Sequence, residues 1–449
     1  MRQDRVFIGC GAGFAGDRTD AGRAVAQELS KCDGPRFMIY ETLAERTLAQ
    51  AQLRLMNGGP GYLPRTEAFL KPVLEICLSH GIRIIGNFGA ADPAAACSRI
   101  AQLCNELGLR KPKLAYVAGD NVMDGPARNA LDKARMDQRE LVAANAYIGA
   151  ASICEALDDG AEIVVTGRVS DPSLALGPLM HVFKWGWEDW DRLAAGTLCG
   201  HVLECAAQVT GGYFADPGIK DVPDLANIGF PVAEISRDGV ITISKPSGTG
   251  GCVTVSTVRE QVLYEIDDPA SYITPDVVLD LTNVRIAEAG PDRVTLSGAK
   301  GREKPRSLRA MACYKGGWFG EAEISYTGPN AVKRGRLAAD ILDSRLRKLD
   351  IPQNRVDLIG VDAISGSCNA DPVSLAQVPE IRVRLAVETS TRERAQIALD
   401  EVESLYLCGP AGGGGVRNHL VERLSSEPVL IPRELVTSHA VKFDEASHG

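Results

Sequence analysis

The N-terminal half of the chain alternates short apolar runs with amphipathic stretches. The apolar runs are continuously hydrophobic rather than alternating, which is typical of strands covered on both faces. They are "RVFIG" (5–9), "RFMIY" (36–40), "IRIIGN" (82–87), "KLAYVAG" (113–119) and "AEIVVTG" (161–167). Helical patterns lie between them, for example over 20–29 and 94–107. This alternation predicts an α/β fold whose sheet is parallel and has right-handed crossovers.

The pattern changes beyond about residue 185. A tryptophan-rich segment, "KWGWEDWD", leads into a long predicted helix over 192–209, and β-like runs with glycine turns follow. From residue 331 onward the order is helix, strand, strand, helix and a glycine cluster. We therefore predict an α/β main domain over 1–330 that carries the site and is open to subdivision near 185–220. A smaller α+β C-terminal domain is predicted over 331–449.

Composition and charge indicate which kinds of partner and which compartment to expect. The 449 residues are 45% hydrophobic and 24% charged, with a net charge of −9 and both signs interleaved along the chain. A nucleic-acid or anionic-membrane surface needs clustered Lys and Arg, so neither partner is expected, and a small-molecule substrate is favoured. The twelve cysteines form no C-x-x-C pair, and no signal peptide or membrane-spanning segment is recognised. These features predict a reduced, cytoplasmic protein.

The predicted sheet also indicates where a site should lie. Ligands of open parallel sheets bind outside the carboxyl ends of the strands. Polar residues and glycines follow the ends of all five predicted strands. This set includes Gly11, Gly13, Asp17, Arg18, Glu41, Asn87, Asp120, Arg168 and Asp171. We therefore predict the site in the N-terminal half.

The first glycine loop allows more than one interpretation. Gly11, Gly13 and Gly16 fit the dinucleotide fingerprint G-x-G-x-x-G after a predicted strand. Asp17 and Asp20, however, fall at the start of the next predicted helix, where they would repel a pyrophosphate. A substrate-facing turn, or a tight structural turn with an acid-capped helix, fits better than a nucleotide cradle. No nicotinamide or flavin cofactor is predicted.

A polar stripe marks the predicted helix over 192–209. His201, Glu204, Cys205 and Gln208 follow the spacing i, i+3, i+4 and i+7, so they share one helix face. The stripe is either a buried hydrogen-bond network or a pocket wall in which His201 and Glu204 transfer protons. Imidazole, carboxylate and thiolate are also metal ligands, so binding of a divalent metal is a third interpretation of the stripe. No second ligand cluster supports it.

Two further segments are candidates for anion binding. Arg168 follows the fifth predicted strand, where it could grip a carboxylate in bidentate fashion, or could pair with Asp171 to brace the loop. In "KPSGTGGCVT", Lys245 precedes a turn containing Thr249 and Gly250 whose backbone amides could form an anion nest. The cluster "CGPAGGGGVR" near the C-terminus could do the same, or be a flexible turn.

Several longer stretches resemble a known family. They are "GAGFAGDR", "NFGAADP", "VTGRVSDPSLALGPLMHVFKW", "AGTLCGHVLECAAQVTGGYFAD", "GFPVAEI", "KPSGTGGCVT", "EQVLYEIDDPASYITPDVVLDLT" and "CGPAGGGGVR". Together they span nearly the whole chain and are similar to the AtuA-type acyclic terpene utilisation family. The resemblance assigns the first glycine loop to that family's pattern. It implies a cytoplasmic protein of bacterial carboxylic-acid catabolism, as in terpenoid breakdown through acyl-CoA intermediates, and supplies no reaction. One departure is Asp92, which replaces an amide and would change selectivity if its loop touches substrate.

Our leading hypothesis is a lyase or hydratase acting on a branched or unsaturated carboxylic acid or its CoA thioester. Arg168 and loop amides would hold the carboxylate, His201 tuned by Glu204 would move a proton beside it, and Asp120 and Asp171 would orient it or bind water. The other predicted substrate-binding residues are Gly11, Gly13, Asp17, Arg18, Glu41, Asn87, Gln208, Lys245, Thr249 and Gly250. The alternative is a non-catalytic acyl-CoA-binding or scaffolding subunit that needs a partner chain. We expect a homo-oligomer, and an assembly with a small partner subunit is the alternative.

Overall fold

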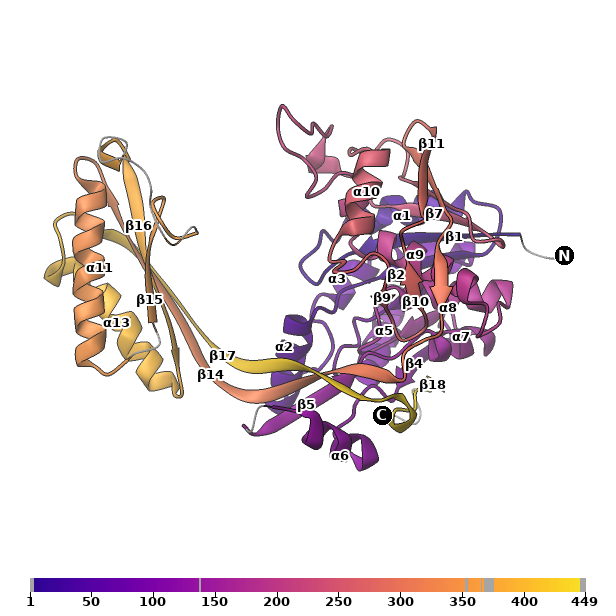
Figure 1. Cartoon of the computed structure of the whole chain (residues 1–449), viewed down its shortest axis with the longest axis horizontal. Helices are drawn as coiled ribbons and strands as arrows, with labels where there is room; N and C mark the ends of the chain where they lie inside the picture. The colour runs from indigo at the N-terminus through magenta and orange to yellow at the C-terminus, as the bar shows by residue number, and fades with distance from the viewer. Residues whose placement is uncertain (1–3, 137–138, 352–353, 365, 367–374, 445–449) are drawn as a thin grey trace. The chain divides into compact units, whose positions relative to one another are not determined.

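The computed structural model divides the chain into two compact units (Figure 1). It describes residues 4–136, 139–351, 354–364, 366 and 375–444. The first unit is Met1–Cys313 with Ser426–Gly449, and the second is Tyr314–Ser425. These bounds differ from the predicted ranges 1–330 and 331–449, because the chain returns to the first unit near its end. Both boundaries fall inside long strands, β14 (Ser307–Thr327) and β17 (Gly414–Pro432), where no turn signal marks them.

The first unit is built on a mixed sheet of ten strands. Its order is β11-β12-β8-β7-β1-β2-β3-β6-β4-β18. The five predicted strands form its centre as β1 (Arg5–Ala12), β2 (Arg36–Tyr40), β3 (Arg83–Gly86), β6 (Ile163–Val165) and β4 (Leu114–Ala118). Neighbouring strands within this central group are parallel. The predicted α/β class with parallel pairing is therefore confirmed for this part of the sheet.

Antiparallel strands extend the sheet on both sides of the parallel group. On one side they are β7 (Val232–Ser236), β8 (Ile241–Ser244), β12 (Arg293–Ser297) and β11 (Arg285–Gly290). On the other side β18 (His439–Lys442) pairs with β4. The purely parallel sheet that the N-terminal pattern predicted is thus wrong at its edges. The added strands come from distant parts of the chain, which local periodicity does not reveal.

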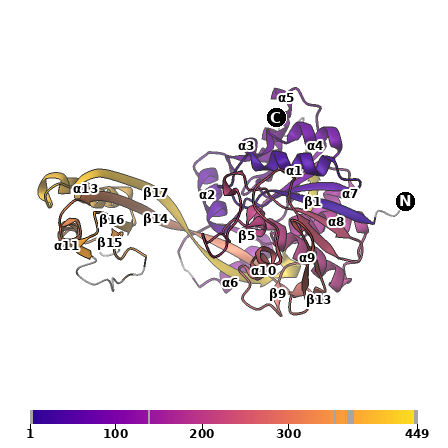
Figure 2. The same cartoon turned by 90° about the horizontal axis from the view of Figure 1, so that it is seen from above.

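Helices cover both faces of this sheet. Figure 2 shows α1 (Ala21–Ser30) and α4 (Leu74–His80) on one side of β1, with α8 (Ser173–Phe183) and α9 (Trp190–Glu204) on the other. The side chains of Val25 and Leu29 on α1 are fully buried, as their i, i+4 spacing requires. Because both faces are covered, the strands between them are apolar throughout, and the polar groups are left at the strand ends.

The remaining elements of the first unit complete the surroundings of the site. They are α2 (Glu45–Met56), α3 (Thr66–Leu70), α5 (Pro93–Glu106), α6 (Gly125–Ala134), β5 (Leu141–Ala146), α7 (Ala151–Asp158), α10 (Val255–Leu263) and a small sheet of β9 (Tyr272–Ile273), β10 (Val278–Asp280) and β13 (Lys300–Arg302). Asp92 precedes α5, and its carboxylate accepts a hydrogen bond from the amide of Ala95 at 3.0 Å. This residue therefore acts as a helix N-cap. No described helix is long and apolar enough to cross a membrane.

The second unit has the order β14, α11 (Ala331–Lys348), β15 (Asn354–Ile359), β16 (Glu380–Thr389), α13 (Arg392–Cys408) and β17. Its sheet order is β15-β16-β14-β17, which is the split βαβ arrangement of ferredoxin-like folds. Leu342 of α11 and Leu399 of α13 pack with Val383 and Leu385 of β16 in one apolar core. The sequence predicts the two helices and the two strands between them; the flanking strands are additions.

Candidate active site

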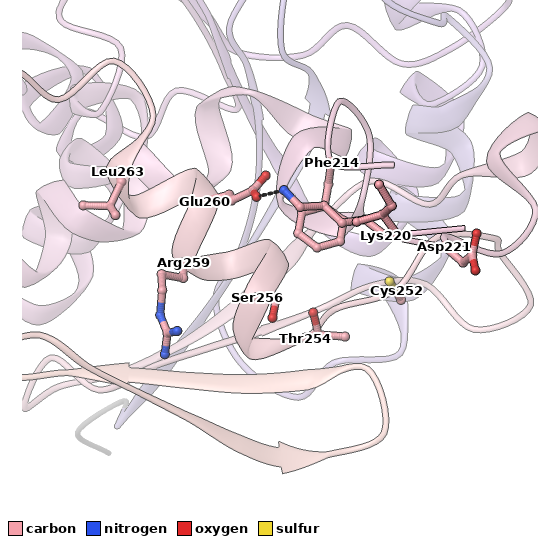
Figure 3. A pocket seen from close by; sticks show the side chains of 10 residues that line it. Phe214, Lys220, Asp221, Cys252, Thr254, Ser256, Arg259, Glu260 and Leu263 are labelled. Atoms are coloured by element: carbon pink, nitrogen blue, oxygen red, sulfur yellow. Dashed lines mark hydrogen bonds and ion pairs between the residues drawn. The ribbon is translucent and has the colours of Figure 1, made fainter. Parts of the chain in front are cut away.

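Two cavities of about 700 Å³ each lie in the first unit. One of them lies beside α10 and is lined by Phe214, Lys220, Arg259 and Glu260 among others (Figure 3). The ammonium group of Lys220 pairs with Glu260 and lies 4.7 Å from the ring centre of Phe214. Both charged side chains are 40% exposed or more, so water screens their interaction. None of the predicted site residues, all of which the structure describes, lines this cavity.

The second cavity lies at the carboxyl ends of β2 and β6, where the sequence places the site. We call it the catalytic cavity after the residues His201, Glu204 and Asp171, which line it and which the sequence analysis predicts to be catalytic. Its polar lining consists of Glu45, Arg46, Tyr147, Arg168, Ser170, Asp171, His201, Glu204, Glu265, Tyr272, Thr274, Ser307 and Arg309. Its apolar lining includes Ile266, Ile273, Leu308 and Leu430. Four of the predicted residues therefore meet here: Arg168, Asp171, His201 and Glu204.

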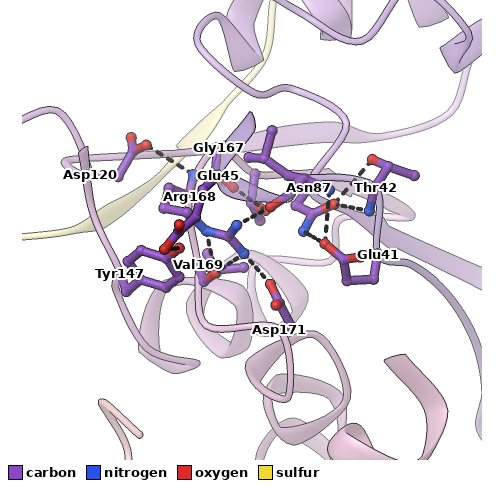
Figure 4. A network of polar contacts seen from close by, with 12 residues as sticks. Glu41, Thr42, Glu45, Asn87, Asp120, Tyr147, Gly167, Arg168, Val169 and Asp171 are labelled. Atoms are coloured by element: carbon purple, nitrogen blue, oxygen red, sulfur yellow. Dashed lines mark hydrogen bonds and ion pairs between the residues drawn. The ribbon is translucent and has the colours of Figure 1, made fainter. Parts of the chain in front are cut away.

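Arg168 is the centre of a buried polar network (Figure 4). Only 1% of its surface is exposed, and its Nε atom donates to the carbonyl oxygen of Val169 at 2.9 Å. The guanidinium group also donates to the carbonyl oxygen of Leu43 and to the carboxylate of Asp171. Its central carbon lies 4.5 Å from the ring centre of Tyr147. Most of its N–H groups therefore donate to groups of the protein itself. This arrangement is the one expected if Arg168 pairs with Asp171 to brace the loop.

Asp120 connects this network to the strand β5. Its Oδ2 atom accepts hydrogen bonds from the amide of Arg168 and from the side chain of Asn145, both at 2.9 Å. Burial raises the pKa of Asp120, while these two donors lower it. Asn145 lies on β5, a strand that the sequence analysis did not predict. Asp120 therefore positions the loop after β6 and does not line the catalytic cavity.

Glu41 and Asn87 form a second buried group beside Arg168. The Oε1 atom of Glu41 accepts from the amide of Leu43 at 2.8 Å and from Asn87 at 3.0 Å. Asn87 in turn accepts from the amide of Thr42 at 2.7 Å. Burial and the nearby charge of Asp171 raise the pKa of Glu41 to about 8, against the opposing effect of Arg168. These contacts fix the ends of β2 and β3, and neither side chain lines the catalytic cavity.

His201 and Glu204 form a buried pair in the last turn of α9. The Nδ1 atom of His201 lies 2.8 Å from the Oε1 atom of Glu204, and its Nε2 atom lies 3.2 Å from the carbonyl oxygen of Val262. The Oε2 atom of Glu204 is buried and has no hydrogen-bond partner among the described residues. Burial raises the pKa of Glu204 to about 7, against the opposing effect of His201. Burial lowers the pKa of His201, but Glu204 outweighs it and the net direction is upward.

The hydrogen-bond partners of His201 determine where the protons of this pair lie. A carbonyl oxygen only accepts, so Nε2 of His201 must carry a proton. The proton between Nδ1 and Glu204 is then shared, as an imidazolium with a carboxylate or as an imidazole with a carboxylic acid. Both ring nitrogens are occupied in either form. The polar atom of the pair that is left to meet a ligand is Oε2 of Glu204.

The polar stripe does not continue to Gln208. The predicted helix over 192–209 is wrong in its last turn, because α9 ends at Glu204 and a 3-10 helix follows over Ala206–Thr210. Ala206 adopts a positive φ of 44° at the break. The i+7 position is therefore rotated away, and Gln208 does not line the catalytic cavity.

The first glycine loop is closed by its own hydrogen bonds. Asp17 accepts hydrogen bonds from the amides of Gly13 and Arg18, both at 2.8 Å, so its carboxylate takes up amides that a bound phosphate would use. A Cβ on Gly13 would lie 2.5 Å from the carbonyl carbon of Cys205, and Gly11 lies inside β1. Arg18 pairs with Asp20 at 2.8 Å. None of these described residues lines the catalytic cavity.

The turn after Lys245 is also closed by its own contacts. The ammonium group of Lys245 donates to the carbonyl oxygen of Thr249 at 2.9 Å and pairs with Asp292 at 3.2 Å. A Cβ on Gly250 would lie 1.9 Å from the carbonyl oxygen of Asp224, so this glycine is required for packing. These three predicted substrate-binding residues lie outside the lining of the catalytic cavity.

Sequence reasoning missed several residues of the cavity. Arg309 pairs with Glu45 and is 49% exposed, and Arg46 has no hydrogen bond or ion pair with any described residue. Glu265 has a positive φ of 59°, and the ring centre of Tyr272 lies 5.3 Å from that of His201. Glu265 and Tyr272 fall within "EQVLYEIDDPASYITPDVVLDLT", a stretch that carries the family resemblance. The family resemblance of that stretch is the feature of the sequence that could have indicated these two residues. Across the described residues, no three His, Cys, Asp or Glu side chains gather as a metal-ligand set.

Comparison with known proteins gives one match. The family described as "Acyclic terpene utilisation family protein AtuA" matches residues 6–442. No curated protein and no solved structure matches the chain.

Proposed function

Because the chain belongs to the acyclic terpene utilisation family, we propose that it is a cytoplasmic catabolic enzyme of the lyase or hydratase class. The substrate is a branched or unsaturated carboxylic acid or its CoA thioester, and the chemistry is general acid–base catalysis. The observation that carries this proposal is the Oε2 atom of Glu204, which has no hydrogen-bond partner among the described residues and lies at the wall of a cavity of about 700 Å³. A buried acceptor without a partner is costly, so its presence requires an explanation, and a catalytic role is one.

The cavity lining suits a substrate with one apolar and one anionic end. Ile266, Ile273 and Leu308 offer contacts for a branched hydrocarbon chain. Arg46 is exposed and unpaired among the described residues, and Arg309 is half exposed, so both can meet a carboxylate or a phosphate that enters from solvent. His201 and Glu204 are buried and so lie at the deep end. The bound substrate would therefore direct its anionic end outward and its carbon chain toward Glu204.

In this mechanism Glu204 is the group that moves the proton. A general base works best when its pKa is close to the working pH, and the pKa of Glu204 is about 7. For dehydration, its carboxylate removes a proton from the carbon next to the carboxyl or thioester group. The electron pair of that C–H bond is first held as the enolate of the carboxyl or thioester group, and it then forms the double bond as the hydroxyl leaves from the next carbon. Hydration is the reverse, and Glu204 then returns the proton to carbon. His201 holds the carboxylate in place and sets its pKa.

Hydrogen exchange in D₂O tests this proposal. A panel of branched acids and their CoA thioesters is incubated with the protein, and mass spectrometry measures deuterium uptake at the carbon next to the carbonyl group. Glu204→Gln should reduce the exchange rate by about 100-fold or more. The matched control is Glu260→Gln on α10, which changes a paired carboxylate of the other cavity and should leave exchange intact. Exchange by Glu204→Gln within a few-fold of wild type would refute the assignment.

The alternative function gives a different result in the same experiment. A non-catalytic acyl-CoA-binding or scaffolding subunit would be stabilised by a CoA thioester but would catalyse no exchange, either alone or as a homo-oligomer. Exchange would then appear only after a partner chain is added.

A further inference from the structure

The hydroxyl group of Tyr272 is a second candidate for proton transfer. Tyr272 lines the catalytic cavity together with Glu204, and its ring is inclined by 55° to that of His201. The hydroxyl group has no hydrogen-bond partner in the part of the chain that the structure describes. Tyr272 is half-buried. Its hydroxyl group is therefore available to a substrate that occupies the cavity.

The backbone that carries Tyr272 is well held. Tyr272 pairs with Leu279 in the small sheet of β9 and β10. The loop between these strands is fixed by Asp276, which accepts from the amide of Ala150 at 3.0 Å and from the hydroxyl of Ser173 at 2.6 Å. The phenol ring therefore projects from an anchored segment. A group held in this way can keep a reacting geometry without reorganisation.

The surroundings of Tyr272 keep its hydroxyl protonated. Burial raises its pKa well above the usual value, and the carboxylates of Glu204, Asp171 and Glu265 add to this effect. Glu204 has a pKa of about 7 in the same cavity. The two side chains therefore form a set of one proton donor and one proton acceptor at neutral pH. Paired groups whose pKa values are pushed apart mark the acid and the base of a reaction.

We propose that Tyr272 is the general acid that protonates the leaving hydroxyl of the substrate. This inference rests on the function proposed above. Glu204 first takes the proton from the first carbon and leaves the C–H electron pair as an enolate. This pair then becomes the double bond as the C–O bond breaks toward the hydroxyl. The proton of Tyr272 completes the water molecule, and Glu204 later returns its proton to the phenolate. In hydration the steps run in reverse: Glu204 first takes the proton of Tyr272, the phenolate takes a proton from the attacking water, and Glu204 gives its proton to carbon.

The exposure of Arg46 and Arg309 explains why the anionic end is assigned to them and the hydroxyl to Tyr272. Arg46 and Arg309 are exposed and receive the carboxyl or thioester end, whereas Tyr272 lies against the buried ring of His201. The carbon that bears the hydroxyl is one bond further from the anionic end than the carbon that Glu204 deprotonates. It therefore lies further from Arg46 and Arg309, on the side of the cavity where Tyr272 contacts His201.

Two readouts on one variant test this role. Tyr272→Phe keeps the ring and removes the hydroxyl, and the control is Tyr213→Phe, which makes the same change on a tyrosine that is 88% exposed. In D₂O, Tyr272→Phe should keep deuterium exchange within about threefold of wild type while net hydration or dehydration falls about 100-fold. Glu204→Gln should lose both activities.

The other outcomes are separable. Net turnover by Tyr272→Phe within a few-fold of wild type would overturn the role of Tyr272. Loss of exchange together with turnover, in a variant that melts like wild type, would also overturn it, because Tyr272 would then act in the same step as Glu204. Unchanged exchange in Glu204→Gln would instead refute the proposed function itself. If Tyr272→Phe does not fold, a fluorinated tyrosine at position 272 should shift the alkaline limb of the turnover profile to lower pH, and an unshifted limb would refute the proposal.

Discussion

His201 and Glu204 share one proton across 2.8 Å, and the second ring nitrogen of His201 is held by the carbonyl oxygen of Val262. From the sequence, His201 is the expected proton carrier and Glu204 its tuning partner. The geometry reverses these roles in our proposal, because the free polar atom belongs to Glu204. His201 then acts through Glu204 and is a positioning residue.

His201→Asn tests this order of roles. His201 lowers the pKa of Glu204, so its removal should raise that pKa above its present value of about 7. The base form of Glu204 would then appear only at higher pH. We expect the rising limb of the pH–rate profile to move up by about one pH unit and the rate at pH 7 to fall about fivefold. A steady-state profile between pH 5 and 10 measures both effects.

A general loss of folding in His201→Asn would lower the rate at every pH without moving the limb, so the profile separates the two causes. Complete inactivity at all pH values in a variant with wild-type melting behaviour would contradict the positioning role. It would show that His201 itself transfers the proton to substrate.

Gly13 links the first glycine loop to the site. A Cβ there would lie 2.5 Å from the carbonyl carbon of Cys205, the residue after Glu204. Gly13→Ala must therefore push the end of α9 away. We expect a loss of about 1–3 kcal/mol in the free energy of unfolding, measured by urea denaturation, together with reduced activity. Gly414→Ala is the matched control, because no atom lies within 4 Å of a Cβ at that position. Equal stability of the two variants would argue against the close contact.

Lys245 offers a test of the predicted anion site. Its ammonium group forms an ion pair with Asp292 and donates a hydrogen bond to the carbonyl oxygen of Thr249. Neither partner lines the catalytic cavity. Lys245→Ala should therefore keep turnover within about threefold of wild type and cost about 1 kcal/mol in stability. Steady-state kinetics and urea denaturation are the measurements. A rise in KM of more than tenfold in the folded variant would restore Lys245 as a substrate ligand.

The sequence predicts the centre of the fold well because burial on both faces leaves a strong local pattern. All five predicted N-terminal strands lie in the main sheet. The strand β5 escaped detection because its sequence, LVAANA, is rich in alanine and carries an asparagine. The outer strands β7, β8 and β18 join the sheet from distant segments, and such pairing leaves no periodic signal in any short window.

The site was predicted in part, for a related reason. The rule for strand ends predicts Arg168 and Asp171, and helical spacing predicts His201 and Glu204, and all four line the same cavity. The same rule cannot tell a side chain that faces the cavity from one that fastens the loop behind it, such as Glu41 or Asp120. Tyr272 and Arg309 come from elements that follow much later in the chain, and only the fold brings them together.

Glu41 provides a last test, of stability rather than activity. Its pKa is raised from 4.5 to about 8, mainly by burial, so near neutral pH the folded protein binds a proton that the unfolded chain has released. This contribution to stability is complete below about pH 4.5 and is lost as the pH rises through about 8. Glu41→Gln should remove that loss, because its amide is neutral at every pH and its oxygen can still accept from the amide of Leu43. We expect the variant to gain stability relative to wild type between pH 5 and pH 9, by the order of a few kcal/mol. Urea denaturation across this range measures the difference, with Glu75→Gln on the exposed face of α4 as control. A difference between Glu41→Gln and wild type that stays constant with pH would show that Glu41 is ionised in the folded protein.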